Sequence, residues 1–309
     1  MAVRQRLVFT AALLSLLACG EDSPTAPQEL EPVDLLVTSA WLSTRLTNPE
    51  VVVLHVGTDA VYRAGHIPGA RFIAITTIAP ERNGNPFELA DTPALEAAFE
   101  AAGVSDASHV VIYTDAGITQ AARAFFTLDY LGHRRVSLLD GGLDIWKVEN
   151  RPMNTDTPVA TAGALTLRLQ DQRIVTADWL RQRLSDPAIV LLDARPSNEY
   201  SGQVAGSFAP PRPGHIPGAL NVFWRDLVLS ATDQRFKDKE TLRAAYTAIG
   251  AAAAGKRVVS SCITGVLSSV TYFVARYLDL DVTLYDGSFL EWSRRPELPV
   301  AKCGTPMCP

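Results

Sequence analysis

The amino-acid sequence contains one pattern twice, and this internal repeat constrains the fold more than any other feature. Three segments of the first half recur in the same order in the second half: VTSAWLSTRL and VTADWLRQRL (Val37–Leu46, Val175–Leu184), GHIPGARF and GHIPGALN (Gly65–Phe72, Gly214–Asn221), LLDGGLDIW and LYDGSFLEW (Leu138–Trp146, Leu284–Trp292). The order is kept while the spacing changes, which is typical of a duplicated domain. At 309 residues, the chain is long enough to give each copy its own hydrophobic core.

Within the second copy, short apolar runs alternate with amphipathic segments. The sequence predicts strands at 188–194, 256–261 and 281–287, and helices at 239–251 and 266–278. Apolar strands that alternate with helices are typical of a mainly parallel sheet covered on both faces. We therefore expect an α/β fold of two tandem domains, each a mainly parallel sheet flanked by helices. In such sheets, ligands bind beyond the carboxyl ends of the strands.

The N-terminus has the features of an export signal. Arg4 and Arg6 precede an apolar run, Leu7–Ala18, that is too short to span a bilayer. The run leads into LLAC, which ends at Cys19 and resembles a bacterial lipobox, whose cysteine is lipidated and becomes the mature N-terminus. The next segment, 20–33, is rich in proline and acidic residues and is typical of a flexible tether.

These features predict an exported protein that is anchored by lipid on the periplasmic side of a membrane. Gly20, rather than an aspartate, follows Cys19. In a Gram-negative cell, the resemblance to a lipobox then implies the outer membrane. A signal peptide that is simply cleaved, with no lipid attached, is the alternative.

The charge and the cysteines narrow the expected partners. The formal net charge is -5 and no cluster of Lys and Arg interrupts it, so nucleic acid is not an expected partner. Cys303 and Cys308 lie close together in the tail and are candidates for a local disulfide. Two thiols without a neighbouring histidine are too few for structural zinc. Cys262 is then left over, and an unpaired cysteine in an exported chain is a candidate reactive thiol.

Cys262 follows an apolar strand and begins a loop that leads into a predicted helix. A free cysteine is most often a small core residue, so its neighbours must support a catalytic interpretation. Gly265 permits a positive φ in the middle of the loop, so backbone N–H groups can turn inward around the sulfur. Together with the helix N-terminus they would stabilise a thiolate, the nucleophilic form. The predicted anion-binding loop comprises Ile263, Thr264, Gly265, Val266, Leu267 and Ser268.

The two GHIPGA segments, the two DG segments followed by tryptophan, and the cysteine loop of the second half resemble the tandem-domain rhodanese family of sulfurtransferases. The resemblance covers nearly the whole chain after the signal. It implies a thiosulfate sulfurtransferase in which Cys262 takes a sulfane sulfur, forms a persulfide and passes it to cyanide or a thiol. It also implies a small anionic sulfur donor, a site at the interface of the two domains, and no metal or organic cofactor.

On this basis we divide the chain into a lipoprotein signal peptide (1–19), a flexible tether (20–33), a catalytically silent first domain (34–152), a linker (153–165), a catalytic second domain (166–302) and a cysteine-containing tail (303–309). The first domain is expected to be silent because we align Asp115 with the cysteine, and a carboxylate cannot carry transferable sulfur. We expect Asp115 to be an exposed polar residue of an inactive loop.

Further site residues follow from the resemblance. Asp193 and Arg195 match the segment that faces the active loop, where Arg195 either contacts substrate or is held by Asp193. Arg212 matches a substrate-side arginine of related enzymes, and a guanidinium can hold two oxygens of an anion. Mercaptopyruvate-type relatives have a second arginine where this chain has Glu199, which would repel a carboxylate donor. We therefore predict thiosulfate as the donor, with 3-mercaptopyruvate as the alternative.

His66 and His215 occupy the repeated GHIPGA segment. Because the segment also occurs in the half without the cysteine loop, its first explanation is a scaffold turn fixed by proline and glycine. His66 is kept as a candidate supporting residue, since mercaptopyruvate-type relatives use a histidine of the first domain near the sulfur.

A phosphatase and a sulfur-binding module are the two alternative functions. A phosphatase of similar fold needs an arginine six positions after its cysteine, and this chain has Ser268 there, so phosphatase activity is not expected. A surface-anchored module that binds or senses sulfur without rapid turnover is a second alternative. Rapid turnover with a small acceptor would distinguish the enzyme from such a module.

Overall fold

The computed structural model describes residues 31–115, 117–159 and 161–303. The predicted signal peptide with Cys19, nearly all of the tether, and Cys308 lie outside these residues. Contacts divide the chain after Glu31, and the following residues form one compact unit that contains both repeats. Within the described residues, no helix is both long and apolar enough to cross a membrane.

Each repeat forms one α/β domain. The first domain has the strands β1 (Leu36–Val37), β2 (Val51–Gly57), β3 (Arg71–Ala74), β4 (His109–Tyr113) and β5 (Val136–Leu139), and the helices α1 (Ser39–Ser43), α2 (Asp59–Ala64), α3 (Ile75–Ile78), α4 (Thr92–Ala101), α5 (Thr119–Leu131) and α6 (Gly142–Val148). The second has the strands β6 (Ile174–Val175), β7 (Ile189–Asp193), β8 (Leu220–Asn221), β9 (Arg257–Ser261) and β10 (Val282–Tyr285), and the helices α7 (Ala177–Arg181), α8 (Ser197–Tyr200), α9 (Lys239–Ala248), α10 (Ser268–Tyr277) and α11 (Ser288–Arg294), with short 3₁₀ turns at Asp171–Arg173 and Trp224–Leu227.

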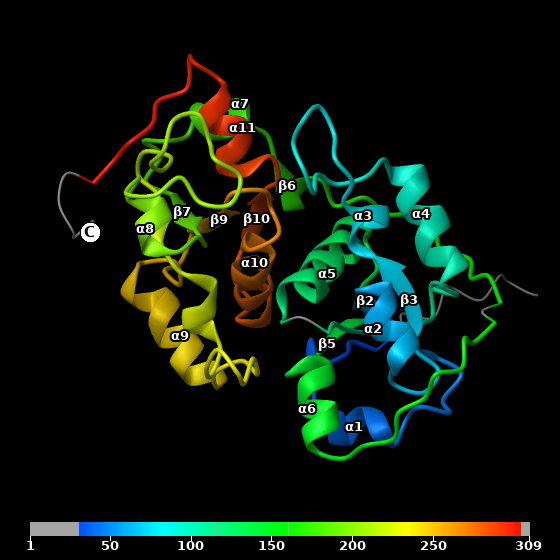
Figure 1. Ribbon diagram of the computed structural model, residues 1–309. Coiled ribbons are helices and arrows are strands. Elements are labelled where there is room, and N and C mark those ends of the chain that lie inside the picture. The colour runs from blue at the N-terminus through cyan, green and yellow to red at the C-terminus, as the bar shows by residue number, and fades with distance from the viewer. Residues whose placement is uncertain (1–30, 116, 160, 304–309) are drawn as a thin grey trace, which may run out of the picture. The chain divides into compact units, whose positions relative to one another are not determined.

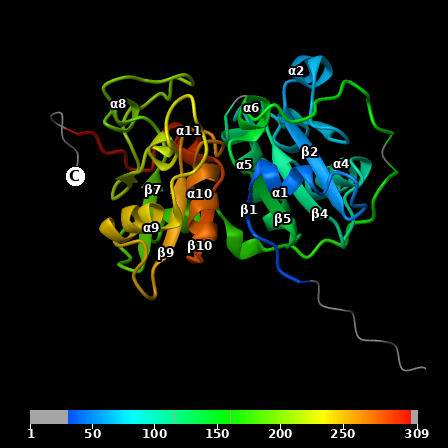
Figure 2. The same ribbon diagram turned by 90° about the horizontal axis from the view of Figure 1, so that it is seen from below.

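The two sheets have the same topology. The first has the strand order β1-β5-β4-β2-β3 and the second β6-β10-β9-β7-β8, and all the pairings between these strands are parallel. Helices lie along both faces of each sheet (Figures 1 and 2). This arrangement confirms the duplication and the predicted fold class.

The central strands form because their residues are apolar and covered on both sides. All five residues of β4 are buried, as are four of the five residues of β7 and of β9. Continuous apolar strands of this kind are found in parallel sheets. The predicted strands 188–194, 256–261 and 281–287 contain β7, β9 and β10, and the predicted helices 239–251 and 266–278 contain α9 and α10.

The threonine of the repeated segments Val37–Leu46 and Val175–Leu184 caps a helix in each domain. Thr38 accepts a hydrogen bond from the N–H of Trp41 at the start of α1, and Thr176 accepts one from Trp179 at the start of α7. Threonine at this position satisfies an N–H group that the first helical turn leaves without a partner. The same local chemistry therefore begins the first helix of both domains.

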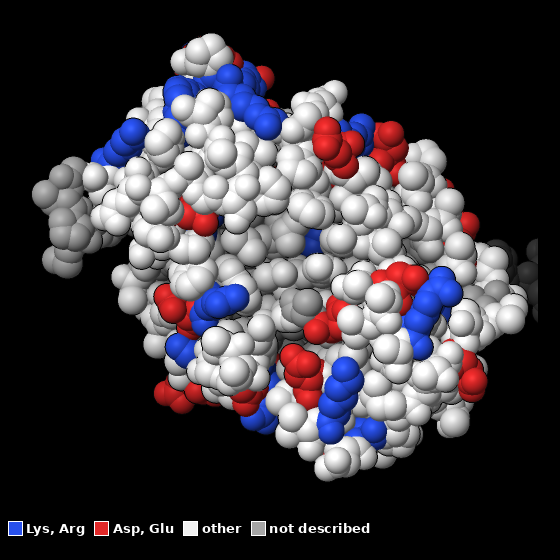
Figure 3. All heavy atoms as spheres, in the orientation of Figure 1, with Lys and Arg blue, Asp and Glu red and all other residues white. Residues whose placement is uncertain are grey.

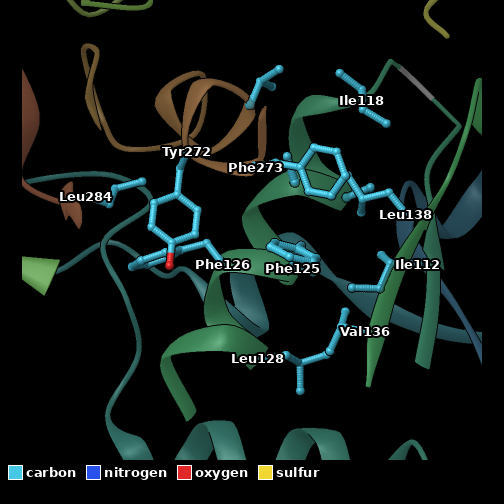
Figure 4. Packing of buried hydrophobic residues seen from close by; sticks show 14 of the residues in the cluster. Ile112, Ile118, Phe125, Phe126, Leu128, Val136, Leu138, Tyr272, Phe273 and Leu284 are labelled. Atoms are coloured by element: carbon cyan, nitrogen blue, oxygen red, sulfur yellow. The ribbon is translucent and has the colours of Figure 1, made fainter. Parts of the chain in front are cut away.

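Helices α5 and α10 join the two domains. Each follows the loop at the end of its domain's central strand, and the two pack against each other (Figure 1). The rings of Phe125 and Phe273 meet edge to face with centroids 4.9 Å apart, and those of Phe126 and Tyr272 with centroids 5.0 Å apart. Figure 4 shows these four rings between the helices, inside one hydrophobic cluster with members from both domains. Because α5 and α10 pack together, the loops that lead into them from β4 and β9 are also held relative to each other.

Strand positions correct the alignment of these two loops. β4 and β9 occupy equivalent places in their sheets, and the first residues after them are Thr114 and Cys262. A glycine follows three residues later in both loops, Gly117 with φ +86° and Gly265 with φ +84°. Thr114, and not Asp115, therefore stands in the place of the cysteine. The alignment was wrong by one residue; the Val-Val pairs at 110–111 and 258–259 and the two loop glycines give the same register as the strand pairing.

The prediction that Asp115 is exposed was also wrong. Its side chain is only 4% exposed, with one carboxylate oxygen 3.6 Å from Nε2 of the buried His55. Both carboxylate oxygens also lie 3.3 Å from the backbone nitrogen of Thr58, which donates to them. The expectation of a silent first domain does not depend on this correction, since the hydroxyl of Thr114 is no thiol either.

Equivalent aspartates receive a loop from the opposite domain. Asp140 follows β5, and its carboxylate accepts a hydrogen bond of 2.9 Å from the N–H of Phe236 in the second domain. Asp286 follows β10 and accepts one of 2.8 Å from the N–H of Leu89 in the first domain. Nη1 of Arg123, also from the first domain, lies 2.5 Å from the other oxygen of Asp286. Each domain thus closes over the strand ends of the other.

Asp140 makes stability depend on pH. Burial raises the pKa of its carboxyl to about 6, although the Phe236 N–H and Arg235 act in the opposite direction. A carboxyl whose pKa is higher in the folded state stabilises that state at low pH, and the contribution is lost as the pH rises from about 4 to about 6. Asp140→Asn keeps an acceptor for Phe236 but cannot ionise.

We therefore expect Asp140→Asn to gain stability relative to the wild type as the pH rises: its free energy of unfolding, minus that of the wild type, should be about 1–2 kcal/mol larger at pH 7 than at pH 4. Urea unfolding at both pH values measures this difference. The same relative stability at both pH values would contradict the expected buried, titrating carboxyl.

Candidate active site

Cys262 lies where β9 ends, in the loop that leads into α10. This is the edge at which parallel α/β sheets bind ligands. The residue is fully buried, belongs to the hydrophobic cluster that joins the domains, and is the free cysteine among the described residues. Burial alone would suit an inert core cysteine, so the polar groups around the sulfur must decide.

The loop directs a backbone N–H at the sulfur. The nitrogen of Gly265 lies 3.2 Å from Sγ of Cys262 and donates to it. Gly265 has φ +84°, which glycine adopts without steric cost. A Cβ at this position would lie 2.7 Å from an oxygen of Asp286 and 3.0 Å from Nη1 of Arg123, so the close packing also requires glycine. One amide of the predicted anion-binding loop therefore faces the sulfur.

The rest of the loop closes around Cys262. Ile263, Thr264 and Ser268 are buried, whereas Val266 and Leu267 are half-buried. Ser268 Oγ donates a hydrogen bond of 3.0 Å to the carbonyl of Gly265, which fixes the turn. Leu267, the residue that caps α10, has no side-chain acceptor for the first helical turn. Instead, the N–H groups of Ser269 and Val270 donate to the carbonyls of Val266 and Leu267 at 3.2 and 3.1 Å, so the backbone of the loop closes the first turn.

The backbone of the loop is tied to the start of α11. The N–H of Cys262 donates to Oγ of Ser288 at 3.1 Å, and the N–H of Phe289 donates to the carbonyl of Cys262 at 3.0 Å. The N–H of Leu290 also donates to the carbonyl of Ile263 at 3.1 Å. These bonds orient the nucleophile's main chain independently of its side chain.

Arg195 is held by Asp193. Its Nε and Nη2 donate to the two carboxylate oxygens of Asp193 at 2.9 and 2.6 Å, and Nη2 also donates to the carbonyl of Gly214 at 2.7 Å. The guanidinium lies over the ring of Phe289, 4.3 Å from its centroid. Burial acts to lower the pKa of Arg195, but the charge of Asp193 and its hydrogen bonds to the guanidinium raise it. Of the two roles expected for Arg195, the structure shows the one in which Asp193 holds it.

The guanidinium of Arg212 is hydrogen-bonded to the backbone of the second domain. Its guanidinium donates to four backbone carbonyls at the end of α11, those of Trp292 (3.1 Å), Ser293 (2.8 Å), Arg295 (2.6 Å) and Leu298 (2.8 Å). The last carbonyls of a helix lack partners within the helix, and a guanidinium with several donors satisfies them. The prediction that Arg212 orients the donor is therefore corrected to a structural role at the end of α11.

The two GHIPGA histidines have nearly the same surroundings. His66 stacks on Tyr62 with ring centroids 4.0 Å apart, and His215 stacks on Tyr200 at the same distance. The Nδ1 atom of each lies close to the carbonyl of its stacked tyrosine, and Nε2 of His66 lies 2.9 Å from the carbonyl of Asp156. Both histidines thus serve the scaffold, and the ring nitrogens of His66 are occupied by carbonyls of the first domain and of the linker.

The first domain supplies residues beneath the catalytic loop that the sequence did not single out. Arg123 projects from α5, is fully buried, and pairs with Asp286 next to Gly265. Its Nη2 donates to the carbonyl of Phe87 at 2.8 Å. Phe87 has a positive φ of +62°, which is unusual for a residue with a side chain. The ring of Phe87 in turn meets that of Phe208 in the second domain. In the sequence, the one sign of this role was that Arg123 is a charged residue among the apolar residues of α5.

The charge distribution suits a small solute rather than a polyanion. Figure 3 shows basic and acidic side chains scattered over this face, around a central hollow with mainly uncharged walls. A cavity of about 570 Å³ is lined by residues of both domains, including Glu88 and Asp286, but Cys262 is not among them. Among the described residues, no group of three or more His, Cys, Asp or Glu side chains is placed to hold a metal ion.

The tail cysteines are only partly described. Cys303 is disulfide-bonded, and its N–H donates to the carbonyl of Ser201 at 3.3 Å. Cys308 lies outside the described residues, so the pairing of these two cysteines stays a prediction.

Comparison with known proteins agrees with this arrangement. The rhodanese-like domain model matches residues 38–149 and 176–295. The chain is 31% identical to the thiosulfate sulfurtransferase of Azotobacter vinelandii, over 91% of this chain and 99% of that protein. It is 34% identical to the sulfur carrier protein TtuD of Thermus thermophilus, over 87% of this chain and 97% of that protein.

A solved structure shows the same fold. The crystal structure of SseA from Escherichia coli, described as a 3-mercaptopyruvate sulfotransferase, matches with a TM-score of 0.73 and 26% identity, over 83% of this chain and 99% of that one. The chain therefore belongs to the rhodanese-like family and contains two copies of the domain in tandem. Family membership and the names of these relatives agree with the predicted sulfurtransferase activity.

We expect the buried Arg123–Asp286 pair to matter more for stability than an exposed one. The side chains are 0% and 12% exposed, and removing one partner of a buried pair costs about 3–5 kcal/mol. Arg123→Met should lower the free energy of unfolding by that amount, and Arg276→Met, which breaks the more exposed interdomain pair with Asp129, should cost less. Urea unfolding compares the two variants; equal losses would contradict the dominant role of Arg123.

Proposed function

We propose that the protein is a sulfurtransferase that moves a sulfane sulfur from thiosulfate to cyanide or a thiol through a persulfide on Cys262. In the first step, the thiolate attacks the outer sulfur of thiosulfate. A new S–S bond forms, the bond from that sulfur to the sulfonate sulfur breaks, and sulfite leaves with the electron pair. In the second step, cyanide attacks the terminal sulfur and a C–S bond forms; the persulfide S–S bond breaks, its electron pair returns to Sγ as the thiolate of Cys262, and thiocyanate leaves.

The observation that carries the proposal is the environment of the sulfur. Cys262 begins the loop that leads into α10, six residues before the helix starts, and its Sγ accepts a hydrogen bond of 3.2 Å from the N–H of Gly265. Hydrogen bonds from backbone N–H groups and a helix N-terminus favour the charged forms, which are the thiolate before attack and after release of sulfur. Neither group needs to move between the two steps. The loop can therefore serve both half-reactions.

Thiosulfate is the donor that the surroundings favour. Glu199 stands where a carboxylate-binding arginine occurs in mercaptopyruvate-type relatives, and its half-buried carboxyl packs against Gly206. Burial raises the pKa of Glu199 while Arg195 lowers it, so this acid shares the electrostatic environment of the fixed arginine. At this place the chain therefore lacks the guanidinium that would pair with the carboxylate of 3-mercaptopyruvate, a group that thiosulfate does not carry. The name of the Azotobacter vinelandii relative supports the same donor.

Two alternatives keep specific support. The structure of SseA supports 3-mercaptopyruvate as the donor. The similarity to a protein named as a sulfur carrier supports a module that holds the persulfide for a partner without rapid turnover. Both use Cys262, so they differ from the main proposal in the donor or in the rate of release.

The decisive experiment measures thiocyanate formed from thiosulfate and cyanide by the mature chain and by Cys262→Ser. We expect turnover by the wild type and a loss of at least about a thousand-fold in the variant, since the variant lacks the nucleophile. Turnover with 3-mercaptopyruvate alone would support the alternative donor. One sulfur atom added per chain, detected by intact mass without turnover, would support the carrier. Equal rates in both proteins would overturn the role of Cys262.

We also propose that the chain is exported and lipidated at Cys19, which anchors it on the periplasmic side of a membrane, or on the outer membrane in a Gram-negative cell. Support comes from the apolar run, the LLAC segment and the tether that follows it. A single lipid chain binds membranes weakly, whereas several chains on one cysteine anchor a protein stably.

Phase separation in a nonionic detergent tests this proposal. The wild type expressed in a bacterium should enter the detergent phase, and Cys19→Ser should stay in the aqueous phase. A wild-type protein that stays aqueous and carries a cleaved, unmodified N-terminus would establish the plain signal peptide instead.

A further inference from the structure

The DG segments of the two domains differ at the first residue of the helix that follows. In the first domain this residue is Gly142, with φ +56°, and in the second it is Ser288, with φ +51°. Glycine adopts such a conformation freely, whereas a Cβ brings a steric penalty. The second domain therefore has a serine at a backbone position where its own duplicate has the better-suited glycine.

The contacts of Ser288 supply a reason for the serine. The side chain is fully buried, and its Oγ donates to the carbonyl of Tyr285 at 2.9 Å while accepting from the N–H of Cys262 at 3.1 Å. A hydroxyl can do both, because donating its proton leaves lone pairs for another donor. The N–H of Phe289 holds the carbonyl of Cys262 from the same helix start. Both main-chain polar groups of the nucleophile are thus fixed.

Fixing the main chain of Cys262 fixes the direction of its Cα–Cβ bond, and so the place of the sulfur. In this arrangement Sγ accepts from the N–H of Gly265 at 3.2 Å. In the first domain, Gly142 has no side chain to offer Thr114, the counterpart of Cys262. A Cβ on Gly142 would lie 3.0 Å from the carbonyl oxygen of Thr114. The serine thus occurs in the copy that carries the thiol.

We propose that Ser288 is a positioning residue for sulfur transfer, which acts through the backbone of Cys262 by holding the sulfur against the N–H of Gly265. The inference rests on the sulfurtransferase function proposed above. Without the hydroxyl, the N–H of Cys262 is either buried without a partner or turns away. In both cases the sulfur loses alignment with the N–H that stabilises the thiolate as attacking and as leaving group.

Ser288→Gly separates positioning from stability, because it removes the acceptor and also relieves the backbone conformation. We expect its urea midpoint to lie above that of Ser288→Ala, because both variants lose the acceptor for Cys262 and only glycine relieves the positive φ. We expect kcat/KM for thiosulfate with cyanide to fall about ten-fold, as for one lost hydrogen bond. Alkylation of Cys262 by iodoacetamide should slow by a similar factor, with its pH profile displaced to higher pH. Ser288→Ala should lose as much activity and also lower the midpoint, since it keeps the strained φ.

Gly142→Ser is the matched control in the first domain. It introduces a serine at the equivalent position, far from the thiol in sequence and without contact to Cys262 in the duplicate loop. We expect a lower urea midpoint with unchanged transfer and alkylation rates. A ten-fold loss of kcat/KM in this control would overturn the proposal, because the effect would then not need the contact with Cys262.

The two readouts keep this inference apart from the proposed function. If the wild type does not transfer sulfur from thiosulfate, the proposed function fails, and the alkylation rates still compare Ser288→Gly with the wild type. Slower alkylation with a urea midpoint above that of Ser288→Ala supports positioning in that case as well. If Ser288→Gly keeps the wild-type transfer and alkylation rates, or unfolds more readily than Ser288→Ala, the positioning role of Ser288 is overturned.

Discussion

The packing of α5 against α10 is the contact on which the rest of the structure depends. Each helix begins directly after the strand-end loop of its own domain, so pressing the helices together also brings both loops to a shared edge. The aromatic pair Phe125 and Phe273 anchors this contact. Because the helices are rigid, residues on α5 of the first domain, Arg123 above all, reach the underside of the catalytic loop of the second.

The two copies of the domain share most of their structure and differ in the loop after the central strand. Both keep the same sheet order, the same capped first helix and an aspartate that receives a loop from the other domain. They differ at the strand end, where one copy has Thr114 and the other Cys262. The first domain has no thiol at this position, but its Arg123 and the loop around Phe87 contact the loop that follows Cys262 or its partner Asp286. Residues of both copies therefore contribute to the surroundings of the cysteine.

The parts of the site that local chemistry controls could be predicted from the sequence, and the parts that depend on distant partners could not. Cys262 and Gly265 follow from one strand, one loop and one helix, all close in sequence. Arg212 resembled a substrate ligand, yet the folded chain gives its guanidinium carbonyls more than eighty residues away to satisfy, such as that of Leu298. Asp115 was misaligned although the sequence carries the register, since the Val-Val pairs at 110–111 and 258–259 and the glycines Gly117 and Gly265 all align Thr114 with Cys262.

The sequence by itself determined the duplicated α/β fold and the position of the reactive cysteine, since apolar periodicity, turn residues and repeated segments act over short distances. Tertiary structure decided how the site is held together. Ser288 reached the N–H of Cys262, and Arg123 reached Asp286, only after sheets and helices from different parts of the chain had packed. The physical reason is that a buried donor or charge takes whichever partner the fold brings within reach, and that partner is set by packing rather than by neighbours in sequence.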